Sequence, residues 1–170
     1  MPSFQNQSPD RDDLKLAHRL ADAAGEAIRP LFRGNWDSER KADRSPVTEA
    51  DRAAEAAIRA ILEAERPDDG ILGEEYGLTR ENAGRRWVLD PIDGTKGFLR
   101  RQQYAVCLAL ITDGVVQVAV LGCPSLPLNA DEPEGAIGCV LVATRGGGAF
   151  IRGLDDATET AIHVSDVTDS

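Results

Sequence analysis

Apolar residues in the first part of the chain recur every three or four positions, which is the spacing of an amphipathic helix. One stripe follows the helix start Ser8-Pro9, and Pro30 should kink or end this helix near Phe32. A second, alanine-rich stripe runs to about Arg66. The two stripes consist of Leu14, Ala17, Ala21, Ala24, Ile28 and Leu31, and of Ala54, Ala57, Ile58, Ile61 and Leu62. We therefore predict two helices, preceded by a disordered tail at residues 1–8.

The pattern then changes to short apolar runs bounded by turn residues, which is typical of β-strands. Two brief strands are predicted at residues 71–73 and 87–89, and Asp113-Gly114 indicates a tight hairpin turn further on. The later strands are predicted at residues 104–112, 115–122, 137–144, 149–151 and 160–164. Pro124 and Pro127 should end the second of these. Two helices followed by a mainly antiparallel sheet predict an α+β fold with both helices packed on one face.

Several other features are interpreted as structural rather than chemical. Residues 76–86 are mostly polar and are predicted to form a loop. Three glycines at 146–148 could cradle a phosphate, but no helix start with Lys and Ser or Thr follows them, so a tight β-turn is predicted. His18 lies beside the first helical stripe and His163 lies in the last predicted strand. We expect both histidines to be structural.

The composition is that of a single globular domain, expected to span residues 9–170. The chain has 170 residues, of which 42% are hydrophobic and 28% charged. Its net charge of −10 argues against nucleic-acid binding, which needs a basic surface. Residues 1–13 do not resemble a signal peptide, and no apolar run approaches the ~20 residues needed to span a membrane. We therefore expect a cytoplasmic protein with neither nucleic-acid nor membrane partners.

The cysteine pattern does not indicate a metal site. Cys107, Cys123 and Cys139 are far apart in the sequence, and each lies in an apolar run. Because no Cys-x-x-Cys pair is present, a zinc site is not predicted. Buried cysteines of this kind behave as small hydrophobic residues, so we expect reduced thiols.

The strongest chemical signal begins where the strand at residues 87–89 ends. Asp90 and Asp93 are three residues apart, and Pro91 between them should force a turn. Such a turn would bring the two carboxylates together and direct the carbonyl of Ile92 toward the same point. Two neighbouring carboxylates repel each other unless a cation lies between them, and oxygen ligands suit Mg²⁺. Gly94-Thr95 then offers backbone N–H groups for a phosphate.

Three chemistries are compatible with paired aspartates, and they differ in spacing. A calcium loop of the EF-hand type needs a downstream glutamate, and no acidic residue occurs between Gly94 and Asp113. An aspartyl-phosphate phosphatase would have one residue between its two aspartates, whereas two separate Asp90 from Asp93. Metal-assisted hydrolysis by water fits best, because metal ions can hold the attacking and leaving oxygens while carboxylates hold the metals.

Two further acidic groups occur earlier in the chain. The strand at residues 71–73 ends in Glu74-Glu75, so it too delivers acids where it leaves the sheet. Thr48 and Asp51 have the spacing of a helix capping box, which by itself is a structural interpretation of Asp51.

Taken together, these motifs resemble the inositol monophosphatase-like superfamily of Mg²⁺-dependent, lithium-sensitive phosphatases. Three separate segments carry the resemblance in the family's order: Thr48-Glu49-Ala50-Asp51, Gly73-Glu74-Glu75, and Trp87 through Thr95. The resemblance extends over nearly the whole chain from Leu14 onward. Each short motif is weakly specific alone, but their combination is highly specific. The resemblance implies a phosphomonoesterase that acts on a small phosphorylated metabolite.

The resemblance also implies a ligand set for Mg²⁺. Glu74, Asp90 and the Ile92 carbonyl would hold a first ion, while Asp90 and Asp93 would reach a second. Glu75 would support this group of ligands.

Catalytic and phosphate-binding roles are implied in the same way. Asp51 and Thr95 would hydrogen-bond to each other and together take the proton from the attacking water, with Glu74 contributing to catalysis. A threonine hydroxyl is a poor base alone and needs a carboxylate behind it. The backbone of Gly94 and Thr95 would bind the phosphate. Lys41 corresponds to a lysine near the family's site.

The two halves of the chain resemble different subfamilies. Leu14 to about Asp93 is similar to bacterial histidinol-phosphate phosphatases. The segment from Asp93 to Ile111 is similar to 3′(2′),5′-bisphosphate nucleotidases, although Arg101 stands where that resemblance leads us to expect glycine. The later half of the chain, where the likeness continues at Gly122-Cys123-Pro124, carries the longer and rarer match, so the sequence favours the nucleotidase. Histidinol phosphate or inositol monophosphate is the alternative substrate.

Family members usually continue into a second α/β domain, which supplies a further metal-binding aspartate and most contacts to the substrate. This chain stops at Ser170, near the point where that domain should begin. We therefore expect a fragment or a minimal variant of the family fold. A metal- or phosphate-binding fragment with little catalysis is the alternative function. Homodimers occur in the family, and an exposed apolar edge would also favour association.

Overall fold

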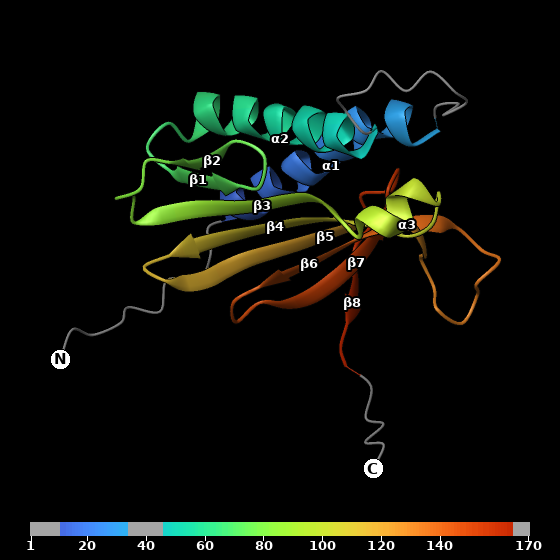
Figure 1. The fold of residues 1–170 in the computed structure, drawn as a ribbon. Helices are drawn as coiled ribbons and strands as arrows, with labels where there is room; N and C mark the ends of the chain where they lie inside the picture. The colour runs from blue at the N-terminus through green and yellow to red at the C-terminus, as the bar shows by residue number, and fades with distance from the viewer. Residues whose placement is uncertain (1–10, 34–45, 165–170) are drawn as a thin grey trace, which may run out of the picture.

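The computed structural model describes residues 11–33 and 46–164 (Figure 1). The helices are α1 (Arg11–Arg33), α2 (Pro46–Glu65) and the short α3 (Thr95–Leu99). The strands are β1 (Gly70–Gly73), β2 (Gly77–Thr79), β3 (Arg85–Asp93), β4 (Ala105–Thr112), β5 (Val115–Pro127), β6 (Ile137–Thr144), β7 (Gly148–Gly153) and β8 (Thr160–Ile162). The tail predicted at residues 1–8 lies outside the described residues.

All described strands belong to one sheet in the order β2-β1-β3-β4-β5-β6-β7-β8. Every neighbouring pair is antiparallel except β1 and β3, which run parallel. Figure 1 shows α1 and α2 lying together on one face, with α1 across β4 and β5 and α2 over β3. The predicted α+β fold, two amphipathic helices on a mainly antiparallel sheet, is therefore confirmed.

The hydrophobic core lies between the helices and the sheet. Strand residues alternate between two faces of the sheet, so every second side chain of a strand points toward α1 and α2. The buried residues include Leu16, Leu20 and Ile28 of α1, Ala54, Ile58 and Leu62 of α2, and Ile71, Trp87, Leu108, Leu110, Val118 and Val120 of the sheet. The buried face of α1 is wider than its predicted stripe, because Leu16 and Leu20 also belong to it. The other sheet face carries half-exposed Leu72 and Leu121.

Several strand predictions need correction. The loop predicted at residues 76–86 contains β2, which pairs with β1 through a tight turn. Pro91 does not force a turn: β3 continues to Asp93, and the pairing with β4 shifts between Asp90 and Asp93. A β-bulge of this kind accommodates a proline that has no N–H for the ladder. Pro124 likewise lies inside β5, beside a second register shift.

The predictions for the hairpin turn and for the cysteines agree with the structure. The Asp113-Gly114 turn joins β4 to β5 with positive φ at both residues, as a tight hairpin requires. The three cysteines are free thiols. His163 lies just beyond β8 and is exposed rather than in the strand. Among residues 11–33 and 46–164, no helix is long and apolar enough to cross a membrane.

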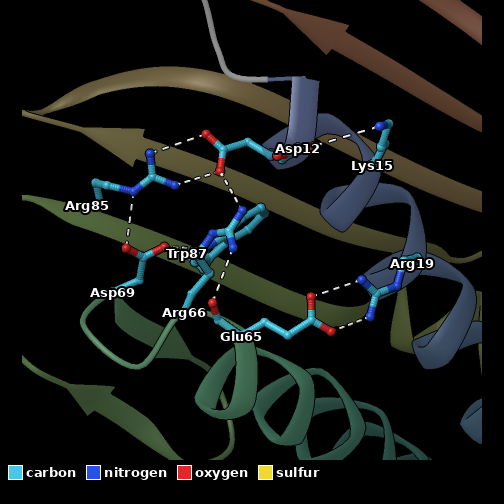
Figure 2. A network of polar contacts seen from close by, with 9 residues as sticks. Asp12, Lys15, Arg19, Glu65, Arg66, Asp69, Arg85 and Trp87 are labelled. Carbon is cyan, nitrogen blue, oxygen red and sulfur yellow. Dashed lines mark hydrogen bonds and ion pairs between the residues drawn. The ribbon is translucent and has the colours of Figure 1, made fainter.

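A network of ion pairs joins the start of α1 to the start of β3 (Figure 2). Arg85 of β3 donates to both carboxylate oxygens of Asp13, at 2.7 and 3.2 Å, and to Asp69 at 3.1 Å. The indole N–H of Trp87 donates to the other oxygen of Asp69 at 3.0 Å. Both aspartates are buried, so their charges depend on these donors. Arg19 and Glu65 form an exposed pair in the same view, which Arg66 links to the network by donating to the Glu65 carbonyl and pairing with Asp13.

Replacing Arg85 should therefore destabilise the fold. Arg85→Gln leaves two buried carboxylates short of donors, and we expect a loss of about 2 to 3 kcal/mol in the free energy of unfolding. Urea unfolding followed by far-UV circular dichroism measures this loss. Arg19→Gln is the matched control, since it breaks an exposed pair and should leave the midpoint nearly unchanged. Equal midpoints for the two variants would contradict the assignment.

Candidate metal and phosphate site

Parallel pairing of β1 with β3 brings two acidic segments together. Gly73 lies opposite Leu89 in the register, so the next residues, Glu74 just beyond β1 and Asp90 still within β3, are neighbours. Carboxyl ends of parallel neighbours meet at the same edge of a sheet, as they do here. The bulge at the end of β3 then places Asp93 close enough to Asp90 to affect its ionisation. Acidic residues from two separate motifs therefore converge at one end of the sheet.

Asp51 approaches this end of the sheet from α2. Its side chain is buried, and among residues 11–33 and 46–164 its Oδ1 has no hydrogen-bond partner. Burial, followed by the charges of Glu75 and Glu74, raises the pKa of Asp51 from 3.8 to about 7. An acid in this environment favours its proton unless a cation offsets the surrounding charge.

Asp90 is in a similar electrostatic environment. Burial, followed by the nearby charges of Glu74 and Asp93, raises its pKa above 3.8. Its Oδ1 is also buried without a hydrogen-bond partner. Cys107 lies opposite Asp90 in β4, and its thiol is 4.0 Å from Oδ2 of Asp93. Burial, with the charges of Asp93 and Asp90, raises the pKa of Cys107 to about 11, so the thiol stays protonated at neutral pH.

Gly94 and Thr95 connect β3 to α3 at the same end of the sheet. Gly94 adopts a left-handed conformation with φ of 97°, which glycine tolerates far better than other residues. Thr95 is the first residue of α3, and both residues are exposed. The N–H groups of a helix's first turn have no acceptor within the helix, so they can donate to an anion.

Packing against the segment that follows holds α3 in place. A Cβ at Gly97 would lie 1.9 Å from the carbonyl oxygen of Gln103, so only glycine permits this approach. Phe98 is buried, and its ring centroid is 5.2 Å from that of Tyr104. Arg101, found where the family resemblance leads us to expect glycine, has φ of 56°. The position therefore has the left-handed backbone that explains why glycine is expected there.

The structure brings together most of the residues that the sequence indicated. The charges of Glu75, Glu74 and Asp90 lie close enough to Asp51 to raise its pKa, and the charge of Glu74 also raises the pKa of Asp90. Ile92 is buried at the end of β3. Lys41 lies outside the described residues, and the hydrogen bond between Thr95 and Asp51 stays a prediction.

The donor set fits a hard divalent cation such as Mg²⁺. Within residues 11–33 and 46–164, no three acidic, histidine or cysteine side chains already converge on one point as metal ligands do. Even so, two buried carboxylate oxygens, from Asp51 and Asp90, lack hydrogen-bond partners. The surrounding groups are carboxylates that repel each other, and oxygen ligands are the ones Mg²⁺ prefers. Glu74, Asp90, Asp93 and the Ile92 carbonyl are the residues that would hold it.

Sequence reasoning missed two residues that organise this site. Glu55 of α2 is fully buried and hydrogen-bonds the backbone of the turn after β1. Arg52 donates to Glu75 Oε2 at 3.0 Å. One feature of the sequence could have indicated Glu55: it lies four residues after Asp51, so the two side chains share a helical face. It was missed because it is charged and borders the apolar stripe.

The fold and these motifs define a family. The family model described as "Inositol monophosphatase family" matches residues 10–170, and the chain belongs to this family. An inositol monophosphatase from Zymomonas mobilis has a solved structure similar to this one, with a TM-score of 0.72 and 40% sequence identity. That similarity covers 92% of this chain and 54% of the other.

Two curated relatives carry more particular names. Histidinol-phosphatase from Mycobacterium tuberculosis is 42% identical over 161 residues, covering 93% of this chain and 57% of the relative. The 3′(2′),5′-bisphosphate nucleotidase of Schizosaccharomyces pombe is 34% identical over 177 residues, covering 75% of this chain and 50% of the relative. This chain thus spans about half the length of the curated relatives it matches.

The raised pKa of Asp51 predicts a pH-dependent stability. An acid with a pKa of 3.8 when unfolded and about 7 when folded binds more protons in the folded state between these values. Without divalent cations, Asp51 contributes its full stabilisation of the folded state below pH 3.8. This contribution to the free energy of unfolding then falls by up to about 1.4 kcal/mol per pH unit as the pH rises toward 7.

Urea unfolding in EDTA at several pH values between 4.5 and 7.5 tests this dependence. Asp51→Asn should flatten the profile, while Glu63→Gln, an exposed residue of the same helix, should keep the wild-type slope. A profile that Asp51→Asn leaves unchanged would show that Asp51 does not have the raised pKa.

Proposed function

We propose that this chain carries the metal- and phosphate-binding part of a Mg²⁺-dependent phosphomonoesterase. One observation carries the proposal: mutually repelling carboxylates from α2, from the turn after β1 and from β3 meet at one end of the sheet, and Asp51 and Asp90 each have a buried oxygen without a hydrogen-bond partner among the described residues. Clustered carboxylates with unpaired oxygens suit a divalent cation, and the N–H groups at the start of a helix suit an anion. A phosphate ester bound through Mg²⁺ satisfies both requirements at once.

Each group then has a distinct role. Glu74, Asp90, Asp93 and the Ile92 carbonyl hold Mg²⁺, which when bound supplies positive charge to the phosphoryl oxygens and activates water. The backbone of Gly94 and Thr95 orients the phosphate. Asp51, which retains a proton affinity near neutrality, accepts the proton of the attacking water together with the Thr95 hydroxyl. Lys41, which lies outside the described residues, corresponds to a lysine near the family's site.

Two substrates are supported by different observations. The curated histidinol-phosphatase matches nearly the whole chain at the higher identity, which supports histidinol phosphate. The segment from Asp93 to Ile111 and the nucleotidase relative support adenosine 3′,5′-bisphosphate. We place histidinol phosphate first, which reverses the order that the later motif alone favours. Family members are also lithium-sensitive, so phosphate release should be inhibited by Li⁺.

The alternative function is binding without turnover. It is motivated by coverage: the chain spans about half the length of its curated relatives, and the family resemblance implies that a further aspartate and most substrate contacts come from a second domain. Losing one ligand from a two-metal site costs several kcal/mol of transition-state stabilisation. Such a chain would bind Mg²⁺ and phosphate through the same residues while hydrolysing esters slowly.

Phosphate release should depend on Asp90. With Mg²⁺, the purified protein should release phosphate from histidinol phosphate or adenosine 3′,5′-bisphosphate, and Asp90→Asn should lower the rate about a hundredfold or more by weakening the metal site. Asp113→Asn is the matched control, because it removes the same charge at the opposite end of β4 and asparagine tolerates its φ of 50°.

Calorimetric titration with Mg²⁺, run in parallel, separates the two functions. Mg²⁺ binding with no turnover on either substrate would exclude the enzyme and support the binding fragment. An Asp90→Asn variant with full activity would show that the site is assigned wrongly.

A further inference from the structure

The turn between β1 and β2 is held by a buried carboxylate from α2. Glu55 has no exposed surface, and its Oε2 accepts the backbone N–H of Glu75 at 2.8 Å. Its Oε1 accepts the N–H of Tyr76 at 3.1 Å and Nε of Arg59 at 2.8 Å. Three donors therefore satisfy a carboxylate that would otherwise be costly to bury.

Arg59 extends this hold one helical turn further along α2. It is also buried, and it donates to the carbonyl oxygen of Gly77. Its guanidinium lies 5.9 Å from the ring centroid of Tyr76. Glu55 and Arg59 are four residues apart and therefore lie on the same face of α2. Together they hydrogen-bond both ends of the segment 75–77.

The same carboxylate explains on steric grounds why the Gly73-Glu74-Glu75 motif begins with glycine. A Cβ at Gly73 would lie 2.0 Å from Oε1 of Glu55 and 2.2 Å from its carboxylate carbon. Because this carboxylate makes the hydrogen bonds that hold Glu55 in place, a larger residue at position 73 would displace the Glu55 side chain. Glu55 thus constrains the backbone immediately before and immediately after Glu74.

We propose that Glu55 is a positioning residue for the metal site, which fixes the backbone that directs Glu74 toward Asp90. The inference rests on the proposed function, because Glu74 is one of the residues assigned to Mg²⁺. The same helix supplies Asp51 four residues earlier, so α2 holds the water-activating acid and the metal-binding turn in fixed relation. A buried ion pair that served only the fold would not need to bond both N–H groups that follow Glu74.

Mn²⁺ binding measured by electron paramagnetic resonance tests the proposal without relying on turnover. Glu55→Gln keeps the size of the side chain but replaces one acceptor oxygen with a donor that faces the N–H groups of the turn. We expect the folded variant to bind Mn²⁺ about tenfold to a hundredfold more weakly than the wild type. Gly73→Ala, which displaces Glu55 by steric contact, should weaken binding in the same direction.

Arg85→Gln is the matched control for a general loss of stability. It also breaks buried ion pairs, but at the opposite end of β3 from Asp93. At a temperature where all variants are folded, its Mn²⁺ affinity should equal that of the wild type. Equal affinities for Glu55→Gln and wild type would overturn the proposal and leave the proposed function intact. A wild-type protein that binds no Mn²⁺ would overturn both.

Hydrogen exchange on the wild-type protein provides a test that needs no variant to fold. If order in the turn favours metal binding, then metal binding must favour order in the turn by the same factor. Addition of Mg²⁺ should therefore slow exchange at the amides of Glu75 and Tyr76. The amide of Gly135, bonded to Glu132 within a distant loop, serves as the control and should not change. Unchanged exchange at Glu75 and Tyr76 in the presence of bound Mg²⁺ would overturn the proposal.

Discussion

Repulsion between carboxylates at the ends of β1 and β3 is the constraint around which this structure is arranged. The only parallel pair among the described strands sets Gly73 opposite Leu89, and this register makes Glu74 and Asp90 neighbours. Asp51 joins them from α2, and burial together with the surrounding negative charge raises its pKa. The fold therefore concentrates charge of one sign where a cation and a phosphate can later balance it.

Such a site opposes stability when its acids are ionised, so the rest of the domain must hold it together. The core beneath α1 and α2 supplies the apolar burial, and Arg85 neutralises the buried acids at the far end of β3. Closer to the site, Glu55 and Arg59 satisfy the backbone of the turn that carries Glu74. Functional sites commonly retain this kind of local strain because the surrounding structure compensates for it.

Much of the fold follows from local patterns in the sequence. The helical stripes predict α1 and α2, and the hairpin of β4 and β5 follows from Asp113-Gly114 between two apolar runs. The prolines were misread, because proline ends an ordinary ladder but is accommodated where the pairing shifts register, as at Pro91 and Pro124. The short strand β2 has no apolar pattern of its own and exists through its pairing with β1.

The sequence by itself determined which residues we propose for the chemistry, since acids at the ends of apolar strands and a Gly-Thr step are local features of the chain. It did not determine how those acids affect each other, because Asp51, Glu74 and Asp90 meet only through long-range packing of α2 and the parallel register of β1 with β3. Tertiary structure alone revealed Glu55 as the residue that bonds the backbone of the turn carrying Glu74. A buried carboxylate becomes favourable only when distant backbone donors surround it, and no local sequence pattern records where those donors will lie.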